Sequence, residues 1–355
     1  MKPLAVYGPA MMVDYRPYSL LEDSKQEYEG YTATNYDDIY SGKVTMYEAL
    51  QNSKNAPAVW LLDQIGISYS KDYLKKMQLL IEDEGLAIAL GGLKTGISPI
   101  QVAQGYRTFI HEGEWITAHS IASIQNRNGE VIGEASPEKV TVFSKQVAWN
   151  MLRMLENVVD NGTAQSGTFS RALAGKTGST QHPHVTGQVK DAWFAGITPE
   201  YVTTMWMGYD QSDEAHYLTE GSSAPTKATK AILEKIDQQQ ALTSTFSKPT
   251  GVEDVEEPIV LPVITDLEAS YKFGGFSLIR GELNWTPSFD NRVIYRIYQA
   301  TSTGANKIGE VKGKGRFTLD NVSLFQSSTY YIVPFNSLTK QEGEPSNQIT
   351  LTFGR

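Results

Sequence analysis

The chain has 355 residues, 40% of them hydrophobic, and its length suggests about two domains. It contains no cysteine, which excludes disulfides, thiolate metal sites and thiol nucleophiles within it. The formal net charge of −9 argues against a nucleic-acid-binding protein, and no apolar run of about 18 residues predicts a transmembrane helix.

The first 43 residues begin with a short apolar stretch from Leu4 to Met12 and then become rich in Tyr, Asp, Gly and Pro. We expect this segment to be irregular and exposed after its apolar start. The N-terminus lacks the apolar core of a signal peptide.

A short helix is predicted from Thr45 to about Gln51, because Thr45 and Glu48 have the spacing of a capping box. Pro57 favours the first turn of a second helix, which should end near Gly66. Ser53 and Asn55 therefore lie on a tight link between two helices, which directs short polar side chains into a cleft. The alternative for Asn55 is a simple helix cap.

Further apolar periodicity predicts four more helices, and Asn128-Gly129 predicts an exposed hairpin at the periphery. The expected helices are Lys71 to about Ile81, Ser98-Pro99 to Gly113, Ser144 to Asn161, and Pro225 to about Ile236.

The stretch from Leu173 to Thr180 has the pattern of an edge strand, followed by a hairpin from Asp191 to Tyr209. Gly175 and Gly178 suit a strand that another backbone approaches closely. Lys176, two hydroxyls and free backbone N–H groups on such an edge would bind an extended peptide that carries a carboxylate. The alternative is a surface Lys-Thr-Gly turn.

Residues 237–262 have the composition of a linker, and residues 263–355 show short alternating runs typical of a small β-sandwich. Trp285 and Tyr295 are expected core aromatics, and this segment resembles a fibronectin type III domain. The predicted strand segments are Ser277–Ile279, Glu282–Trp285, Val293–Tyr298, Arg316–Leu319 and Thr329–Val333.

His182 and His184 have one residue between them, a spacing that can bind a metal ion. No carboxylate or third histidine is clearly placed to complete such a site. We therefore predict no metal centre and interpret this segment as a loop.

Taken together, the motifs of residues 1–236 resemble the transpeptidase domain of class A penicillin-binding proteins, within the superfamily of serine β-lactamases and D,D-peptidases. That family is built on Ser-x-x-Lys, Ser-x-Asn and Lys-Thr-Gly motifs. The blocks that carry the resemblance are Ser53-Lys54-Asn55, Ala89-Leu90-Gly91-Gly92, Gly96-Ile97-Ser98-Pro99, Asn161-Gly162-Thr163-Ala164, Lys176-Thr177-Gly178 and Asp191-Ala192-Trp193-Phe194. The resemblance implies a mixed α/β (α+β) fold with helices around an antiparallel sheet.

The first motif departs from the family pattern. Lys2-Pro3 matches its lysine and proline, so the nucleophilic serine would lie two residues upstream of Met1. We therefore expect a chain truncated at its N-terminus and unable to form an acyl-enzyme as it stands. The resemblance also implies a membrane anchor outside this chain and a location at the outer face of the bacterial cytoplasmic membrane.

The resemblance assigns catalytic roles to Lys2, Ser53, Asn55 and Lys176. Lys2 would take the proton of the serine, with its pKa lowered by burial and by Lys176. Ser53 would relay a proton to the leaving D-alanine, and Asn55 would bind the donor peptide's amide. The predicted substrate-binding residues are Thr177, Gly178, Ser179 and Thr180, with the Ser179 N–H as half of an oxyanion hole.

The implied activity is D,D-transpeptidation of peptidoglycan stem peptides ending in D-Ala-D-Ala, with β-lactams as acylating mimics and no cofactor. The C-terminal sandwich would be available to cell-wall or division proteins. Two alternatives stay open: a D,D-carboxypeptidase or β-lactamase-like hydrolase, and a non-catalytic wall-binding protein on the same fold.

Overall fold

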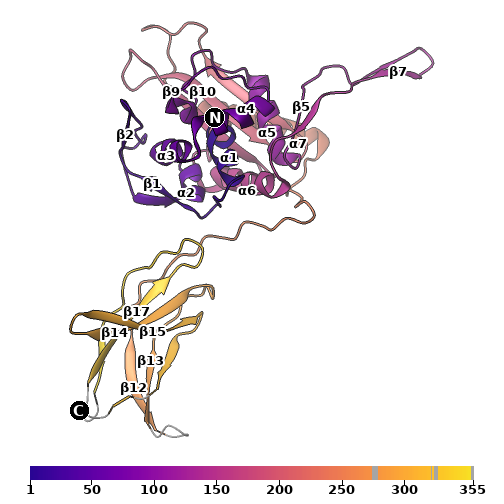
Figure 1. The fold of residues 1–355 in the computed structure, drawn as a ribbon. Helices are drawn as coiled ribbons and strands as arrows, with labels where there is room; N and C mark the ends of the chain where they lie inside the picture. Colours follow the sequence, from indigo (N-terminus) through magenta and orange to yellow (C-terminus); the bar gives the residue numbers. More distant parts are fainter. Residues whose placement is uncertain (274–278, 321, 324–326, 353–355) are drawn as a thin grey trace. The chain divides into compact units, whose positions relative to one another are not determined.

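The computed structural model describes residues 1–273, 279–320, 322–323 and 327–352 (Figure 1). The chain divides into two compact units, Met1–Val255 and Glu256–Arg355. Ser277 and Leu278 of one predicted strand lie outside the described residues. No helix in the described ranges is long and apolar enough to cross a membrane.

The centre of the first unit is formed by the N-terminal segment. A π-helix, η1 (Pro3–Tyr7), continues into α1 (Gly8–Met11), and every residue of both is buried. Gly105 of a neighbouring helix lets this segment pack closely, because a Cβ there would lie 2.7 Å from Leu4 Cδ1. The apolar start of the chain is thus the core of the unit, and Lys2 stands at its N-terminal end.

Three antiparallel strands form the principal sheet of this unit, in the order β11-β10-β9. They are β9 (Ala174–Gln181), β10 (Val189–Ile197) and β11 (Val202–Gly208). The predicted edge strand and hairpin are confirmed. Gly175 is required on β9, since a Cβ would lie 2.6 Å from the Phe194 ring and 2.8 Å from the Ala195 carbonyl oxygen.

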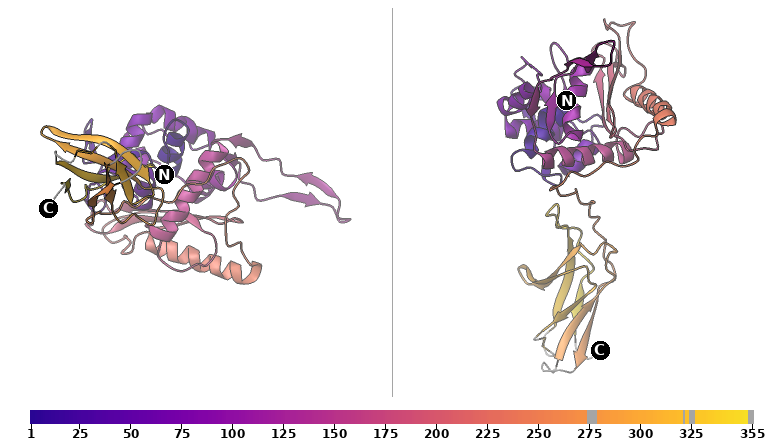
Figure 2. Two further views of the ribbon diagram at one scale, coloured as in Figure 1. Left: turned by 90° about the horizontal axis from the view of Figure 1, so that it is seen from below. Right: turned by 90° about the vertical axis from the view of Figure 1, so that its right-hand side faces the viewer.

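Three long helices pack on this sheet. α5 (Pro99–Ile110) contacts β10 and β11, and α6 (Lys145–Asn161) contacts β9. α7 (Ser223–Gln240) contacts β10 and β11 and lies on the opposite side of the sheet from the N-terminal helices (Figure 2). Ser98 and Ser144 cap α5 and α6 with their side chains, as their positions in the sequence predict.

Four shorter helical segments complete the helical part: α2 (Met46–Gln51), α3 (Ala56–Ile65), α4 (Ile67–Lys76) and the 3₁₀ turn η2 (Leu86–Leu90). The capping box of Thr45 and Glu48 is confirmed. The helix predicted at Lys71–Ile81 instead ends at Lys76. Gln78 has a φ of +56°, which is incompatible with a continuing right-handed helix.

The segment before α2 is more ordered than we expected. β1 pairs with β4, Leu21 is fully buried and Asp23 is 0% exposed. Of the other short pairs, β6–β7 is the predicted Asn128-Gly129 hairpin, and it projects from the unit (Figure 1). The paired strands are β1 (Leu20–Asp23) with β4 (Gly42–Thr45), β2 (Glu27–Tyr28) with β3 (Tyr31–Thr32), β5 (Glu114–Ile116) with β8 (Lys139–Thr141), and β6 (Ser123–Gln125) with β7 (Val131–Glu134).

Much of the segment expected to be a linker packs on the first unit. α7 continues to Gln240, and Phe246 and Val252 are buried in the first unit's core. Trp149 Nε1 of α6 donates a hydrogen bond of 3.0 Å to Asp254. Residues 237–255 therefore belong to the first unit, because apolar side chains within this polar stretch are buried.

The second unit consists of two antiparallel sheets with one apolar core. One sheet has the order β12-β13-β16 and the other β15-β14-β17-β18. Trp285 and Tyr295 are core residues, as predicted, with ring centroids 5.3 Å apart. The strands are β12 (Glu268–Phe273), β13 (Ile279–Asn284), β14 (Ile294–Thr301), β15 (Gly304–Lys312), β16 (Arg316–Leu319), β17 (Ser328–Phe335) and β18 (Ile349–Leu351).

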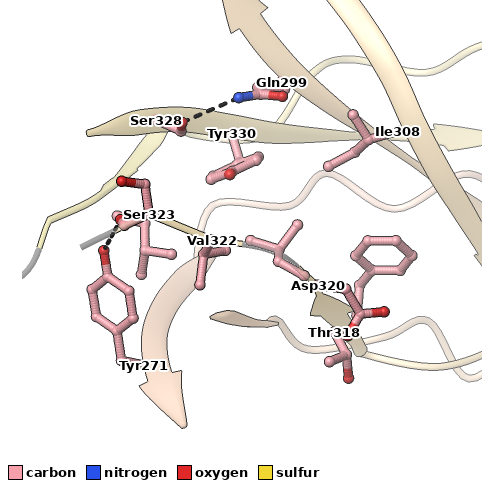
Figure 3. A pocket seen from close by; sticks show the side chains of 12 residues that line it. Tyr271, Gln299, Ile308, Thr318, Asp320, Val322, Ser323, Ser328 and Tyr330 are labelled. Atoms are coloured by element: carbon pink, nitrogen blue, oxygen red, sulfur yellow. Dashed lines mark hydrogen bonds between the residues drawn. The ribbon is translucent and has the colours of Figure 1, made fainter. Parts of the chain in front are cut away.

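A cavity of about 430 Å³ lies within the second unit, lined by residues of both sheets (Figure 3). Its polar side chains include two that are already engaged: Gln299 donates to Ser328 Oγ at 3.1 Å, and Tyr271 donates to the Ser323 carbonyl at 3.2 Å. These two side chains are thus oriented by the fold of the sandwich itself.

Candidate active site

Lys2 lies at the centre of a cluster of acceptors contributed by the link between α2 and α3. Its Nζ donates to the Ser53 carbonyl at 2.6 Å, to Ser53 Oγ at 3.2 Å and to Asn55 Oδ1 at 2.7 Å. Ser53 has a φ of +52°, a rare conformation for a residue with a side chain. With this backbone, both the carbonyl and the hydroxyl of Ser53 reach the same amine.

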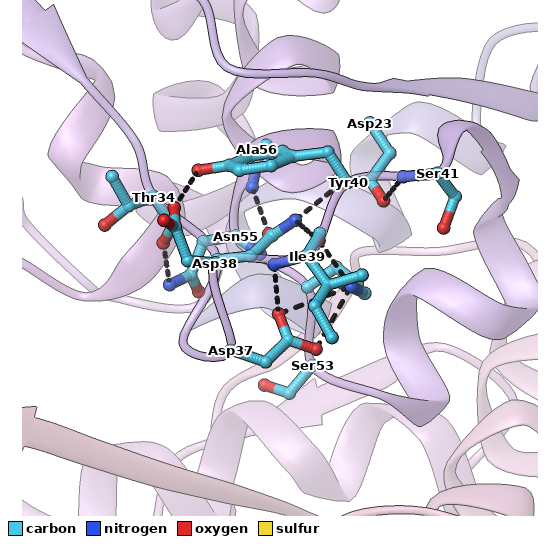
Figure 4. Close-up of polar contacts among 12 residues, drawn as sticks. Asp23, Thr34, Asp37, Asp38, Ile39, Tyr40, Ser41, Ser53, Asn55 and Ala56 are labelled. Carbon is cyan, nitrogen blue, oxygen red and sulfur yellow. Dashed lines mark hydrogen bonds and ion pairs between the residues drawn. The ribbon is translucent and has the colours of Figure 1, made fainter.

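Residues 34–41 form hydrogen bonds that fix the position of the Ser53–Asn55 turn (Figure 4). Asn35 Oδ1 accepts from the backbone N–H groups of Asn55 at 2.8 Å and Ala56 at 3.1 Å, so it caps α3 from outside that helix. Asn35 Nδ2 in turn donates to the buried Asp23 at 2.7 Å. Asn55 Nδ2 donates to the Thr34 carbonyl at 2.8 Å, which turns its Oδ1 toward Lys2.

Lys176 is placed on β9 and is 5% exposed. Its Nζ donates to the carbonyl of Thr177 at 3.2 Å and to Thr177 Oγ1 at 3.3 Å. Both acceptors belong to the next residue on the same strand, whereas the three acceptors around Lys2 come from a distant segment of the chain. The described contacts include no carboxylate beside either amine.

Burial dominates the electrostatics of both lysines. It lowers the pKa of Lys176 to about 7. Burial and, secondly, the positive charge of Lys176 lower the pKa of Lys2 well below its usual value. The two amines are therefore close enough to influence each other, and a neutral lysine can accept a proton at physiological pH.

The hydroxyl groups of β9 extend from the buried lysine toward solvent. Thr177 Oγ1 lies 2.6 Å from Thr163 Oγ1, and Ser179 Oγ accepts from the Ser222 backbone N–H at 3.2 Å. A Cβ at Gly178 would meet Trp193 at ordinary contact distance, and Thr180 is exposed. The predicted substrate-binding residues thus form one continuous edge.

His182 has a structural contact instead of a metal ligand set. Its Nδ1 lies 3.2 Å from the His184 N–H and 2.9 Å from the Val185 N–H, as an acceptor within a turn. No group of three potential ligands occurs in the part of the chain that the structure describes.

Three contributors to this site were missed from the sequence. Asn35 lies in a stretch that has no periodicity, and Ser222 contributes only a backbone N–H. Thr163 lies in the block Asn161-Gly162-Thr163-Ala164, which we singled out without assigning it a role. The resemblance of that block to the family was the sequence signal that could have identified Thr163.

The site combines the buried amines of Lys2 and Lys176 with the Ser53 hydroxyl and the Asn55 amide. Beside them lies an edge strand with exposed hydroxyls. A neutral amine beside a hydroxyl can move a proton, and a cationic strand edge can bind an anion. Acyl transfer at a peptide that ends in a carboxylate uses groups of these kinds.

The chain is similar to known proteins in sequence and in fold. Residues 1–234 match the family described as "Penicillin binding protein transpeptidase domain". Penicillin-binding protein 1F of Bacillus subtilis (strain 168) is 47% identical over 349 residues, which are 98% of this chain and 48% of that protein. Penicillin-binding protein 2a of Streptococcus pneumoniae is 35% identical over 227 residues, 62% of this chain and 31% of that protein.

Solved structures show the same fold at lower identity. Penicillin-binding protein PonA1 from Mycobacterium tuberculosis matches with a TM-score of 0.62 at 24% identity, over 74% of this chain and 75% of that chain. Penicillin-binding protein 1A from Haemophilus influenzae matches with a TM-score of 0.59 at 22% identity, over 75% and 44%. The chain spans about half or less of the length of the curated relatives named above.

Proposed function

The chain belongs to the penicillin-binding protein transpeptidase family, and from that premise we propose that its first unit carries the acyl-transfer site of a D,D-transpeptidase. The donor would be a peptidoglycan stem peptide ending in D-Ala-D-Ala, and a β-lactam would occupy the same site. The observation that carries this proposal is the contact of Lys2 with Ser53 and Asn55, beside a second buried lysine.

The proposed first half-reaction transfers the peptide to a serine three positions before Lys2. The serine oxygen bonds to the penultimate carbonyl carbon, and Lys2 takes the hydroxyl proton. The bond to the terminal D-alanine breaks, Ser53 passes its proton to the leaving nitrogen, and Lys2 returns the proton it took to Ser53. An acceptor amine then attacks the ester, which forms the crosslink and returns a proton to the serine.

The other predicted residues have supporting roles in this proposal. Lys176, Thr177 and Ser179 bind the terminal carboxylate, and the Ser179 N–H faces the developing oxyanion. Asn55 binds the donor amide. The buried position of the Lys176 amine and the exposed hydroxyls of β9 support this assignment.

A labelled penicillin tests the proposal. If the nucleophile is a serine three positions before Lys2, residues 1–355 alone should bind penicillin without covalent labelling, and a chain extended upstream through that serine should be labelled. Lys2→Met in the extended chain should abolish labelling, whereas Lys94→Met, at an exposed position, should not. Labelling of residues 1–355, or full labelling of the Lys2→Met chain, would contradict the assignment.

Product analysis then separates transpeptidation from hydrolysis. With a stem peptide and an acceptor amine, the extended chain should form the crosslinked dimer. Release of D-alanine without a dimer would favour a D,D-carboxypeptidase.

For the second unit we propose a fibronectin type III-like domain that contacts cell-wall or division proteins. Its three-stranded and four-stranded antiparallel sheets around Trp285 and Tyr295 support the first part. We further propose that the protein works at the outer face of the cytoplasmic membrane. Pull-down on peptidoglycan with and without residues 256–355 tests the contribution of this unit.

A further inference from the structure

Thr163 is placed beside a residue of the carboxylate-binding strand, although it comes from a different segment of the chain. Its Oγ1 lies 2.6 Å from Thr177 Oγ1, a short distance for two neutral hydroxyls. Thr163 is exposed, so its side chain borders the open part of the site.

The turn that carries Thr163 is fixed to α2 on one side. The Thr163 N–H donates to the Gln51 carbonyl at 3.3 Å, and Gln51 Nε2 donates to the Asn161 carbonyl at 2.9 Å. Gly162 between them is sterically required, because a Cβ there would lie 2.4 Å from the Gln51 carbonyl oxygen. Gln51 is two residues before Ser53. The turn that carries Thr163 therefore connects the Ser53-x-Asn55 motif with the Lys176-Thr177-Gly178 motif.

A buried lysine fixes the other side of the same turn. Lys230 of α7 is 4% exposed, and its Nζ donates to the carbonyls of Ala164 at 2.9 Å and Gly167 at 3.3 Å. An exposed threonine on a turn anchored at both ends has a defined position. Its contact with Thr177 is therefore a feature of the fold.

The hydrogen bonding of the Thr163–Thr177 hydroxyl pair indicates a role for Thr163. Lys176 donates to Thr177 Oγ1, and either hydroxyl of the Thr163–Thr177 pair can be the donor, so in the free site Thr177 can donate its proton to Thr163. When a carboxylate binds, Thr177 can donate to it instead, and Thr163 can reverse and donate to Thr177. A hydroxyl can make this exchange, but a methyl group cannot.

We propose that Thr163 is a positioning and specificity residue of the carboxylate subsite, which orients the Thr177 hydroxyl toward the terminal carboxylate of the ligand. This inference rests on the proposed function, in which Thr177 binds that carboxylate. It adds a residue from outside the three motifs to the groups that distinguish a free carboxylate from its ester or amide.

The test measures non-covalent binding of benzylpenicillin and of its methyl ester to residues 1–355 by NMR titration. Thr163→Val keeps the shape and removes the hydroxyl, and we expect it to weaken binding of the carboxylate form by up to about tenfold, the usual range for one hydrogen bond between neutral groups. Binding of the ester should be unchanged. Thr163→Ser should restore the carboxylate preference, and Thr168→Val, at an exposed threonine of the same loop, should leave it intact.

The outcomes separate this inference from the proposed function. If the wild-type chain prefers the carboxylate form and Thr163→Val retains that preference, the role of Thr163 is refuted and the proposed function stands. If the wild-type chain binds both forms equally, the carboxylate subsite itself is absent and both are refuted. Equal weakening of both forms by Thr163→Val would indicate a structural role only.

Discussion

The two lysines of the site are buried to a similar extent but are held in different ways. Lys2 is 8% exposed and donates to three acceptors from a separate segment of the chain. Lys176 is 5% exposed, and its two acceptors belong to the adjacent Thr177. Asn35 and Asp23 stabilise the Lys2 side from behind, whereas the Lys176 side is an edge strand with exposed hydroxyls.

This difference shows how the fold divides its polar groups. On the Lys2 side the donors are paired with protein acceptors, which fixes the positions of Ser53 and Asn55 before any ligand arrives. On the Lys176 side the amine has only the two acceptors of Thr177 among the described contacts, so an anionic ligand would add the interaction that this side lacks. The polar groups on the Lys2 side are pre-organised by the protein, whereas the Lys176 side is suited to bind an anionic ligand.

The largest expected effect concerns the buried charge of Lys176. The pKa of Lys176 is about 7 in the folded protein and would return to about 10.5 on unfolding. Between these values the unfolded chain binds more protons, so the stability of the wild-type chain should rise with pH, by at most about 1.4 kcal/mol per pH unit from this group. Lys176→Met should therefore stabilise the first unit most at pH 6, with an advantage that shrinks toward pH 10.

Urea denaturation of the first unit at several pH values measures this difference. Lys94→Met provides the control for loss of an exposed lysine. An advantage of Lys176→Met that is independent of pH would show that the folded Lys176 amine titrates normally, and the contrast between the two sides would lose its electrostatic basis.

A smaller but substantial effect is expected on the Lys2 side. Asn35→Ala removes the acceptor of two N–H groups at the start of α3 and a donor to the buried Asp23. We expect a loss of about 3 kcal/mol in the free energy of unfolding, since buried polar groups are left without partners. Asn128→Ala, at the exposed hairpin tip, should change stability by less than about 0.5 kcal/mol. Equal effects of the two substitutions would remove Asn35 from its supporting role.

The smallest effect compares two glycines on the strand side. Gly175→Ala would bring a Cβ within 2.6 Å of the Phe194 ring and 2.8 Å of a backbone oxygen, which should cost about 2 kcal/mol. Gly178→Ala meets Trp193 at 3.4 Å, an ordinary contact, and should cost less than about 1 kcal/mol. Thermal unfolding of both variants measures the difference. A reversed order would mean that β9 approaches β10 differently from the structure described above.

Much of the architecture follows from local signals in the sequence. The Thr45–Glu48 capping box and the Ser98 and Ser144 caps predict helices because each gives unpaired backbone N–H groups a partner. Pro57 predicts a helix start because it has no N–H to leave unpaired in the first turn. The alternating segment after residue 263 predicts the two sheets for a similar reason, since strand periodicity is a local property. The Lys2, Ser53, Asn55 and Lys176 set was predicted from the family resemblance, and the structure shows Lys2 in contact with Ser53 and Asn55.

Contacts between distant segments could not be read from the sequence. The caps that Asn35 gives to α3 and the hydroxyl pair of Thr163 and Thr177 join residues 20 and 14 positions apart, and neither has a periodic signal. Residues 237–255 read as a linker because they are polar on average, yet Phe246 and Val252 are buried. Tertiary packing also lowers the pKa of both lysines, because desolvation depends on what surrounds a group in space and not on its neighbours along the chain.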